Sequence, residues 1–430
     1  MKKNLFLVLI GLTLSAESFS QTSWKVLPNS PSNIRRHDDV FFVDASTGWI
    51  VNGQGNIFKT TDGGENWSLQ FSTDAYLRSV GFLDAQRGWV GTLNRDHILY
   101  TTSDGGLTWT EVTNIPAPKP LGICGISAVD DSVVYASGRY NSPARVIKTT
   151  DSGASWTSIS MDQYANGLVD CYFLRADSGF VVGWKGDTYT TGIPVILFTV
   201  DGGKTWLRRY TGKEEAEICW KISFPSPQVG YVSLEIFHDG PTFFLDTSDG
   251  GVTWREKRFA DNRADVQGIG FLNETTGWIG GWGLSAFETS NSGQSWHSAG
   301  FGMNINRFRF LSDTLGYAVG QRVYKYSKEA PSAVESPDQT SAPSDFRLEQ
   351  NHPNPFNPET TIRYSIGRTG PVSLQVFNLS GQLIATLVEE VKSTGEYEVK
   401  FDASNLPSGI YFYRLLANQK FLSRKMVLAK

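Results

Sequence analysis

The clearest pattern in the chain is a short apolar run, a polar turn, and a second apolar run that opens with glycine and an aromatic residue. "FFVDASTGWIV" (41–51) and "GFLDAQRGWVG" (81–91) are two of its seven copies. The other five stand at 127–138, 172–183, 223–233, 270–280 and 309–320, and the copy at 127–138 has Val134 in place of the glycine. Two apolar runs around a polar turn predict a β-hairpin. We therefore expect seven hairpins, one in each unit of a repeated structure.

Each hairpin is followed by a third predicted strand, such as "NIFKT" (56–60). In six units an octapeptide comes next, of the form Thr-x-Asp-x-Gly-x-x-Trp or close to it, for example "TSDGGLTW" (102–109). Its closing tryptophans are 42 to 50 residues apart, and a fourth strand begins at each of them. A period of this length, with short strands and no amphipathic helix, predicts a four-stranded β unit such as a propeller blade.

The seventh unit stops after "RVYKYS" (322–327) without a fourth strand. The segment "TSWKVLP" (22–28) resembles the fourth strands that begin at the octapeptide tryptophans. We expect Trp24 to begin the missing strand, so that both ends of the domain share one blade and no sheet edge is left free. The prediction is an all-β chain with a seven-bladed β-propeller over residues 22–328.

The octapeptides predict tight turns with a structural role. A carboxylate can accept hydrogen bonds from its own turn, glycine can adopt a positive φ, and tryptophan can pack between sheets. In the sixth copy Asn291 keeps the hydrogen bonding without the charge. A catalytic carboxylate is not needed in so many copies. The predicted turn residues are Asp62, Gly64, Trp67, Asp104, Gly106, Trp109, Asp151, Gly153, Trp156, Asp201, Gly203, Trp206, Asp249, Gly251, Trp254, Asn291, Gly293 and Trp296.

Beyond the propeller the pattern changes. Residues 329–345 are rich in Pro, Ser, Ala and acidic residues and predict a flexible linker. Residues 346–430 contain short alternating strands and Gly/Pro turns, which predict a small immunoglobulin-like β-sandwich.

The N-terminus predicts a secretory signal peptide over residues 1–20. Lys2 and Lys3 precede the apolar run "LFLVLIGLTL" (5–14), and small residues lead to a cleavage site near Ser20. The run is too short to span a bilayer. We therefore expect the mature protein to leave the cytoplasm. With a net charge of −4, the chain of 430 residues gives no reason to expect a nucleic-acid partner.

Three cysteines, Cys124, Cys171 and Cys219, are too few for a disulfide framework. We expect buried thiols, with a single Cys124–Cys171 disulfide as the alternative. No metal-ligand spacing and no cofactor motif is present, so we expect neither a metal nor a cofactor.

The octapeptides resemble the Asp-box repeats of sialidases. Together with the Gly-aromatic-Val hairpins, about 300 residues resemble the seven-bladed propellers of the photosystem II assembly/stability factor family. That resemblance implies a propeller with its Asp-box turns on the outer rim, and it identifies no ligand.

The C-terminal module resembles the type IX secretion C-terminal sorting domain (type A). An ordinary accessory domain is the alternative. The resemblance implies type IX secretion machinery as a partner, and release or attachment at the outer-membrane surface after export. Its matching sorting-motif residues include Pro353, Asn354, Pro355, Phe356, Asn357, Pro358, Gly409, Tyr411, Lys425 and Met426.

Propellers bind ligands around the central channel, so the loops before the inner strands are the predicted ligand-binding rim. The candidate rim residues are Arg36, Arg78, Trp220, Lys221, Arg263 and Arg307. They suit an acidic glycan or a peptide, and the alternative is an ordinary solvated surface. We expect a monomeric, non-enzymatic propeller that binds an extracellular protein or glycan. The alternatives are a sialidase-like glycoside hydrolase, which needs an arginine trio, a Tyr–Glu pair and an acid/base Asp, and an extracytoplasmic assembly factor.

Overall fold

The computed structural model describes residues 24–33, 36–141, 143–328, 347–367, 369–378, 383–417 and 420–430. These residues form strands and no helix, and therefore no helix in the described part is long and apolar enough to cross a membrane. The chain divides into two compact units, Met1–Pro331 and Ser332–Lys430. The predicted signal peptide (1–20) and linker (329–345) lie outside the described residues.

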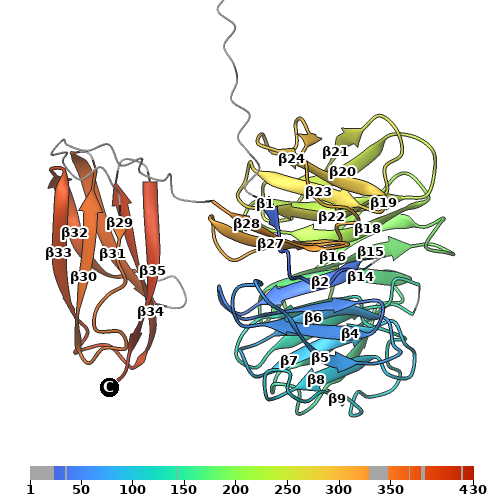
Figure 1. Ribbon diagram of the computed structural model, residues 1–430, viewed down its shortest axis with the longest axis horizontal. Coiled ribbons are helices and arrows are strands. Elements are labelled where there is room, and N and C mark those ends of the chain that lie inside the picture. Colours follow the sequence, from blue (N-terminus) through green and yellow to red (C-terminus); the bar gives the residue numbers. More distant parts are fainter. Residues whose placement is uncertain are drawn as a thin grey trace, which may run out of the picture. The chain divides into compact units, whose positions relative to one another are not determined.

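The first unit contains seven four-stranded antiparallel sheets, which are the predicted blades (Figure 1). Blade 1 consists of β2 (His37–Phe42), β3 (Gly48–Asn52), β4 (Asn56–Thr60) and β5 (Ser68–Ser72). Blade 2 consists of β6 (Leu77–Phe82), β7 (Gly88–Thr92), β8 (Leu99–Thr102) and β9 (Thr110–Glu111). Blade 3 consists of β10 (Gly125–Ala128), β11 (Val134–Gly138), β12 (Arg145–Thr149) and β13 (Thr157–Ser160). Blade 4 consists of β14 (Gly167–Arg175), β15 (Ser178–Lys185), β16 (Ile193–Thr199) and β17 (Leu207–Thr211).

The remaining blades have the same strand order. Blade 5 consists of β18 (Glu217–Ser223), β19 (Gly230–Ile236), β20 (Thr242–Thr247) and β21 (Arg255–Ala260). Blade 6 consists of β22 (Val266–Phe271), β23 (Gly277–Gly281), β24 (Leu284–Thr289) and β25 (His297–Ser298). Blade 7 consists of β26 (Arg307–Phe310), β27 (Leu315–Val319), β28 (Val323–Ser327) and the N-terminal β1 (Trp24–Val26).

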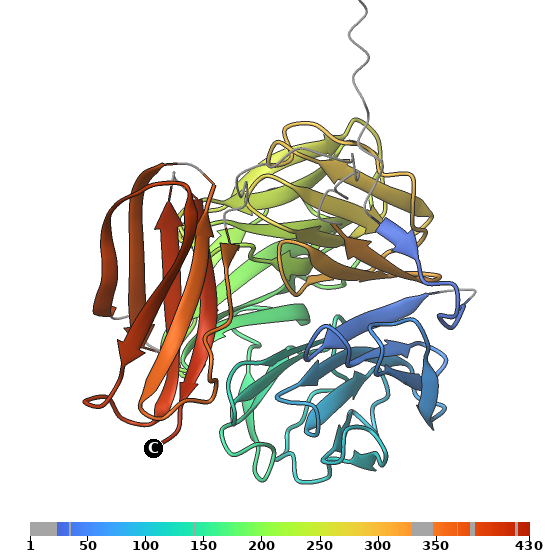
Figure 2. The same cartoon turned by 60° about the vertical axis from the view of Figure 1, so that its left-hand side comes forward.

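The blades form a closed ring. The first strand of each blade contacts the first strand of the next, and β26 of blade 7 contacts β2 of blade 1. In Figure 1 the blue strand β1 lies beside the orange strand β28, and Figure 2 shows the same closure from the side. Trp24 of β1 pairs with Tyr326 of β28. The predicted closure through Trp24 is therefore confirmed.

Stacked aromatic rings between neighbouring blades explain the Gly-aromatic motif. Phe82, at the end of β6, stacks on Trp49 of blade 1 with ring centroids 3.6 Å apart. The octapeptide residue Trp109 packs edge-on against Phe82 at 6.0 Å. Any Cβ on Gly88 would lie 2.4 Å from the Phe82 ring, so only glycine fits at this position of the hairpin. The aromatic clusters supply much of the apolar area buried between blades.

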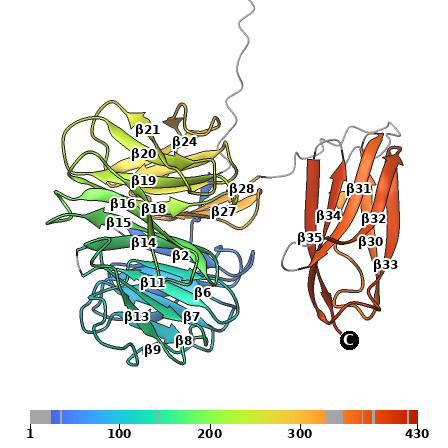
Figure 3. The ribbon, with the colours of Figure 1, turned by 180° about the vertical axis from the view of Figure 1, so that it is seen from behind.

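The second unit is a two-sheet β-sandwich (Figure 3). Residues such as Ile362 and Tyr364 from one sheet share a core with Leu374, Tyr413 and Leu415 from the other. One sheet contains β29 (Arg347–Leu348), β30 (Glu359–Ile366) and β33 (Gly395–Asp402). The other contains β32 (Leu383–Lys392), β31 (Gly370–Asn378), β34 (Gly409–Ala417) and β35 (Lys420–Leu428).

Candidate functional site

The first strand of each blade, which we call its inner strand, lines the central channel. The seven inner strands bring equivalent residues to the same level of this channel. The residue that precedes the apolar centre of each strand forms one such level. It is charged in blades 1, 4, 5 and 7 and small in blades 2, 3 and 6. The seven positions are Asp39, Ser79, Gly125, Asp170, Lys221, Gly268 and Arg307. In five of the seven strands the pairing register with the second strand of the blade shifts at this point, which is the pattern that a β-bulge produces.

Arg307 joins three blades at this level. Its Nε donates to Asp39 Oδ1 over 2.9 Å, and its two Nη atoms donate to the two oxygens of Asp170 over 2.9 and 3.0 Å. All three side chains are buried. Burial acts to raise the pKa of the Asp170 carboxyl, but Arg307 and Lys221 outweigh it, and the pKa lies below its ordinary value. We call Asp39, Asp170, Lys221 and Arg307 the ion-pair layer.

Lys221 is the exceptional member of the ion-pair layer. Its side chain is fully buried, its Nζ lies 3.9 Å from Asp170 Oδ1, and it makes no hydrogen bond to any described residue. Burial, reinforced by the charge of Arg307, lowers the pKa of Lys221 to about 7. A buried ammonium that lacks hydrogen bonds is costly, which is the reason for this shift.

Closer to the start of the inner strands, a second network closes the channel. Arg78 Nη1 donates to Asp38 Oδ1 over 2.5 Å, and its guanidinium lies 5.0 Å from the ring centroid of Trp220. Trp220 Nε1 donates to Asn306 Oδ1 over 3.0 Å. Arg36 donates to Asp38 over 3.1 Å. These residues come from blades 1, 2, 5 and 7, so the network holds the inner strands together.

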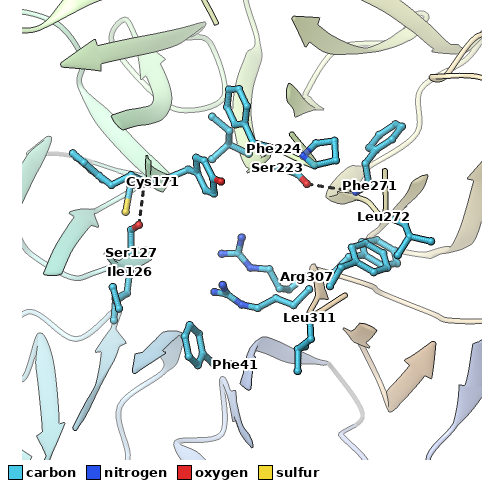
Figure 4. A pocket seen from close by; sticks show the side chains of 18 of the residues that line it. Phe41, Ile126, Ser127, Cys171, Ser223, Phe224, Phe271, Leu272, Arg307 and Leu311 are labelled. Carbon is cyan, nitrogen blue, oxygen red and sulfur yellow. Dashed lines mark hydrogen bonds between the residues drawn. The ribbon is translucent and has the colours of Figure 1, made fainter. Parts of the chain in front are cut away.

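At the other end, where the inner strands finish, the channel widens into a cavity of about 480 Å³ that we call the cup. Figure 4 shows side chains from several blades converging on it, with Arg307 at its base. Half-buried rings of Phe41, Tyr172, Phe224 and Phe310 contribute to its wall. The cup is therefore aromatic at its sides and cationic at its base.

Arg309 supplies the accessible cation of the cup. Its side chain is 28% exposed and its nearest carboxylate, Asp39, is 3.7 Å away and already bound to Arg307. Nε of Arg309 donates to the Val40 carbonyl over 2.6 Å, and the guanidinium stacks 4.8 Å from the Phe41 ring centroid. Arg307 is neutralised by Asp39 and Asp170, so the partly exposed guanidinium of Arg309 is the cation that an anionic group can reach, while Asp313 lines the outer part of the cup.

The six candidate rim residues lie in several environments. Arg307 lines the cup. Arg78, Trp220 and Lys221 lie within inner strands and are buried, where the sequence suggested loops. Arg36 directly precedes β2 and is also buried. Arg263 lies in the loop before β22 and is exposed, with Nε 3.0 Å from Asp265 Oδ1.

Sequence reasoning missed the cup itself. Its wall comes from the ends of the inner strands, whereas the prediction concentrated on the loops before them. Phe41, Tyr172 and Arg309 occupy equivalent positions two residues beyond the ion-pair layer. A period of two along each inner strand would have placed them on the channel side.

The octapeptide turns use their side chains internally. In the second copy Thr102 Oγ1 donates to Asp104 Oδ1 over 2.8 Å, and Asp104 Oδ1 accepts from the Thr108 amide over 2.9 Å. The Gly106 amide donates to Thr102 Oγ1 over 2.9 Å, with a φ of 90° at Gly106. Hydrogen bonds from the Thr108 side chain and amide lower the pKa of Asp104 to about 2.

The sixth turn keeps this geometry with Asn291. Thr289 Oγ1 donates to Asn291 Oδ1 over 2.9 Å, and the Ser295 amide donates to the same oxygen over 3.0 Å. The turn therefore does not require a negative charge.

Among the described residues, no group of three or more His, Cys, Asp and Glu side chains is placed to hold a metal ion. Cys124, Cys171 and Cys219 are buried free thiols, so the alternative of a Cys124–Cys171 disulfide is wrong in this structure.

In the second unit, the predicted sorting-motif segments lie against each other. Phe356 is buried, and its amide donates to the Val427 carbonyl over 2.9 Å. The Val427 amide donates to Asn354 Oδ1 over 2.8 Å. The loop that contains Asn354 and Phe356 thus covers the outer edge of β35, which includes Lys425 and Met426.

The fold and site define a class of protein, a β-propeller with a cavity at its centre, followed in the chain by a β-sandwich. Residues 351–429 match the secretion system C-terminal sorting domain. Residues 16–117 match the photosynthesis system II assembly factor YCF48. The chain is thus similar to Ycf48 in its first unit and to the sorting domain in its second, and the match to the sorting domain indicates export by the type IX route.

Individual relatives agree with these two matches. The photosystem II assembly lipoprotein Ycf48 of Synechococcus sp. (strain CC9902) is 26% identical over 352 residues, covering 74% of this chain and 94% of that protein. The solved structure of YCF48 bound to D1 peptide is 18% identical, with a TM-score of 0.54, covering 73% of this chain and 98% of that one.

A second solved structure is similar over more of the chain. PorZ, a surface component of the type IX secretion system of Porphyromonas gingivalis, is 13% identical with a TM-score of 0.51. The similarity covers 92% of this chain and 59% of PorZ. At these identities both solved structures establish the propeller fold and not a shared ligand.

Proposed function

We propose that this protein is exported after removal of its signal peptide and acts outside the cytoplasm as a non-enzymatic propeller. It binds a peptide segment of a partner protein in the cup. The observation that carries this proposal is the pairing of aromatic walls with the partly exposed guanidinium of Arg309. Such a cavity suits a peptide group that combines an apolar body with a carboxylate.

A peptide ligand has a precedent among the solved structures of this fold. A propeller of the same fold was solved with D1 peptide bound. That structure shows that a propeller of this kind can hold a peptide, and the choice of a peptide for this chain rests on the chemistry of the cup. An assembly role outside the cytoplasm is one function that such binding would serve.

The geometry gives less support to a sialidase-like hydrolase. Asp39 and Asp170, beneath the cup, are buried and bound to Arg307, so neither is free to act as an acid or base. The carboxylate that lines the cup is Asp313, which is exposed to solvent at its outer edge. Arg78 is likewise bound to Asp38. Of the described residues that line the cup, two are arginines, Arg307 and Arg309, which is one fewer than the trio that this chemistry needs.

A thermal-shift panel tests the proposal. The full chain is mixed with peptides that end in a free carboxylate, with the same peptides amidated, and with neutral and acidic oligosaccharides. Each sample reports melting temperature and released reducing ends. A ligand at about 100 times its Kd adds about 2.7 kcal/mol of stability. We expect stabilisation by carboxylate peptides and no sugar release.

Two variants give the panel its controls. Arg309→Gln removes the accessible cation and should abolish the difference between carboxylate and amidated peptides. Arg258→Gln changes an exposed arginine of β21 and should leave the difference intact. Sugar release that requires Arg309, or equal responses from the two variants, contradicts the proposal.

A further inference from the structure

A second cavity adjoins the cup. It measures about 380 Å³ and lies between the hairpin turn after β2 in blade 1 and the equivalent turn after β6 in blade 2. We call it the side cleft. Its lining residues are Phe41, Phe42, Val43, Asp44, Phe82, Leu83, Asp84 and Ala85. Phe41 also lines the cup, so the two cavities share this residue.

The side cleft is apolar where it meets the cup. The rings of Phe41 and Phe82 lie 6.2 Å apart. Val43 and Leu83 are half-buried at equivalent positions in the two turns. An extended chain that leaves the cup over Phe41 would therefore remain on apolar surface between the two turns.

The outer part of the side cleft is acidic. The Ser46 side chain and the Ser46 and Thr47 amides donate to Asp44 Oδ1 over 2.7 Å each and lower the pKa of Asp44. Asp44 is exposed and forms no ion pair with any residue that the structure describes. Asp84 differs, because Arg87 lies 2.7 Å from its Oδ2. Asp44 is therefore the carboxylate of the cleft that is open to an external cation.

We propose that the cup and the side cleft form one composite site for an extended peptide of opposite charge at its two ends. This inference rests on the proposed function of the cup. An anionic group of the peptide sits against Arg309, apolar backbone and side chains cross Phe41, and a Lys or Arg side chain reaches Asp44.

The positions of Arg309 and Asp44 on either side of Phe41 set the distance between the anionic and the basic group of the peptide. The Arg309 guanidinium lies 4.8 Å from the Phe41 ring centroid, and Asp44 comes three positions after Phe41 in the chain. An extended peptide advances about 3.3 Å per residue. The basic residue of the ligand is therefore expected about two to four residues from its anionic group.

Selection from a phage-displayed library of random peptides on the immobilised full chain tests this inference. We expect the selected peptides to share an acidic group near apolar residues and a Lys or Arg at the stated spacing. The best peptide is then synthesised, and its Kd is measured by fluorescence polarisation against the wild type and three variants.

The variants separate the two ends of the site. Asp44→Asn keeps the turn's acceptor oxygen and should weaken binding roughly two- to five-fold, as expected for an exposed ion pair. It should also remove the preference for the basic residue. Asp130→Asn is the matched control, because Asp130 accepts from the Ser132 and Val133 amides in the equivalent turn of blade 3, outside both cavities. It should not change the Kd.

Arg309→Gln distinguishes failure of this inference from failure of the proposed function. If the selected peptides lose affinity with Arg309→Gln but not with Asp44→Asn, the cup binds peptides and the side cleft takes no part, which overturns the inference alone. If no peptide is selected, or if Arg309→Gln changes nothing, both proposals are overturned.

Discussion

Arg307 and Asp170 face each other across the centre of the ring and form a two-point ion pair, with both Nη atoms of one bound to both carboxylate oxygens of the other at 2.9 and 3.0 Å. Arg307 belongs to blade 7 and Asp170 to blade 4, whose inner strands are not neighbours in the ring. The pair thus closes the channel beneath the cup and ties opposite sides of the propeller together.

Replacing Arg307 with Met should destabilise the propeller strongly. The substitution leaves Asp39 without its closest cation and Asp170 with only Lys221 nearby, both buried. Breaking a buried ion pair by removing one partner costs about 3–5 kcal/mol. Urea denaturation at pH 7 measures the loss, with the exposed Arg258→Met as control. A loss below about 1 kcal/mol would show that the pair behaves like a surface ion pair.

The loss of stability caused by Arg307→Met should become smaller as the pH falls. In the wild type the pKa of Asp170 lies below its ordinary value of 3.8, so its contribution to stability is present above that value and lost at lower pH. Without Arg307 the burial of Asp170 would raise its pKa, and ionisation at higher pH would then destabilise the variant. The two proteins should therefore differ more at pH 7 than at pH 4.

Lys221→Met should stabilise the propeller at neutral pH. The pKa of Lys221 falls from 10.5 to about 7 on folding. Between pH 7 and pH 10.5 Lys221 is protonated in the unfolded state and largely neutral in the folded state. The free energy of unfolding of the wild type therefore contains a penalty for burying the ammonium, which disappears as the pH rises from about 7 to about 10.5. The apolar replacement removes this penalty, while Asp170 keeps its two hydrogen bonds to Arg307, so the gain over the wild type should be largest at pH 6 and should shrink as the pH rises towards 10.

Urea denaturation from pH 6 to pH 10 checks this prediction. Lys204→Met, at an exposed position of the fourth octapeptide, is the control. Its free energy of unfolding should change with pH in the same way as that of the wild type. If the free energy of unfolding of Lys221→Met also changes with pH as the wild type does, the ammonium of Lys221 is not the source of the pH dependence.

The octapeptide tryptophans should contribute far more to stability than their exposed neighbours. Trp109 is buried against Phe82, whereas Leu107 of the same turn is 76% exposed. Trp109→Ala should cost about 3–5 kcal/mol, and Leu107→Ala should stay within about 0.5 kcal/mol. Chemical denaturation of the pair measures the difference. Similar losses for both would mean that the turn itself, and not the packing of its tryptophan, stabilises the blade.

Much of the propeller was predictable because its signals are local. The hairpin motif, the octapeptide and their common period each lie within one blade, and Gly88 beneath Phe82 shows why the motif tolerates no other residue there. The incomplete last unit likewise pointed to Trp24, whose pairing with Tyr326 is observed.

The site was less predictable because it is not local. Residues of the ion-pair layer such as Asp39, Asp170 and Arg307 are separated by 131 and 137 residues and meet only when the ring closes. Register shifts in five inner strands also decide which side chains face the channel. Arg78 and Lys221 therefore seemed to belong to open loops, whereas the structure buries them.

Trp24→Ala should open the ring at its weakest point. Trp24 stacks on Phe301 with centroids 4.9 Å apart and meets Trp278 edge-on at 5.5 Å. Its loss should cost about 3–5 kcal/mol. Because β1 is the outer strand of blade 7, its detachment also exposes the edge of β28, and exposed edges promote association between molecules.

Two measurements report the opening of the ring. Calorimetry should show a lower melting temperature for the propeller, while the β-sandwich, which has its own core, keeps its transition unchanged and serves as an internal reference. Light scattering should show concentration-dependent association of Trp24→Ala but not of Lys25→Ala, whose side chain is exposed on the same strand. If Trp24→Ala remains as stable and as monodisperse as Lys25→Ala, β1 pairs with blade 7 without closing it, and the ring must be held by the inner-strand contacts and the Arg307 ion pairs alone.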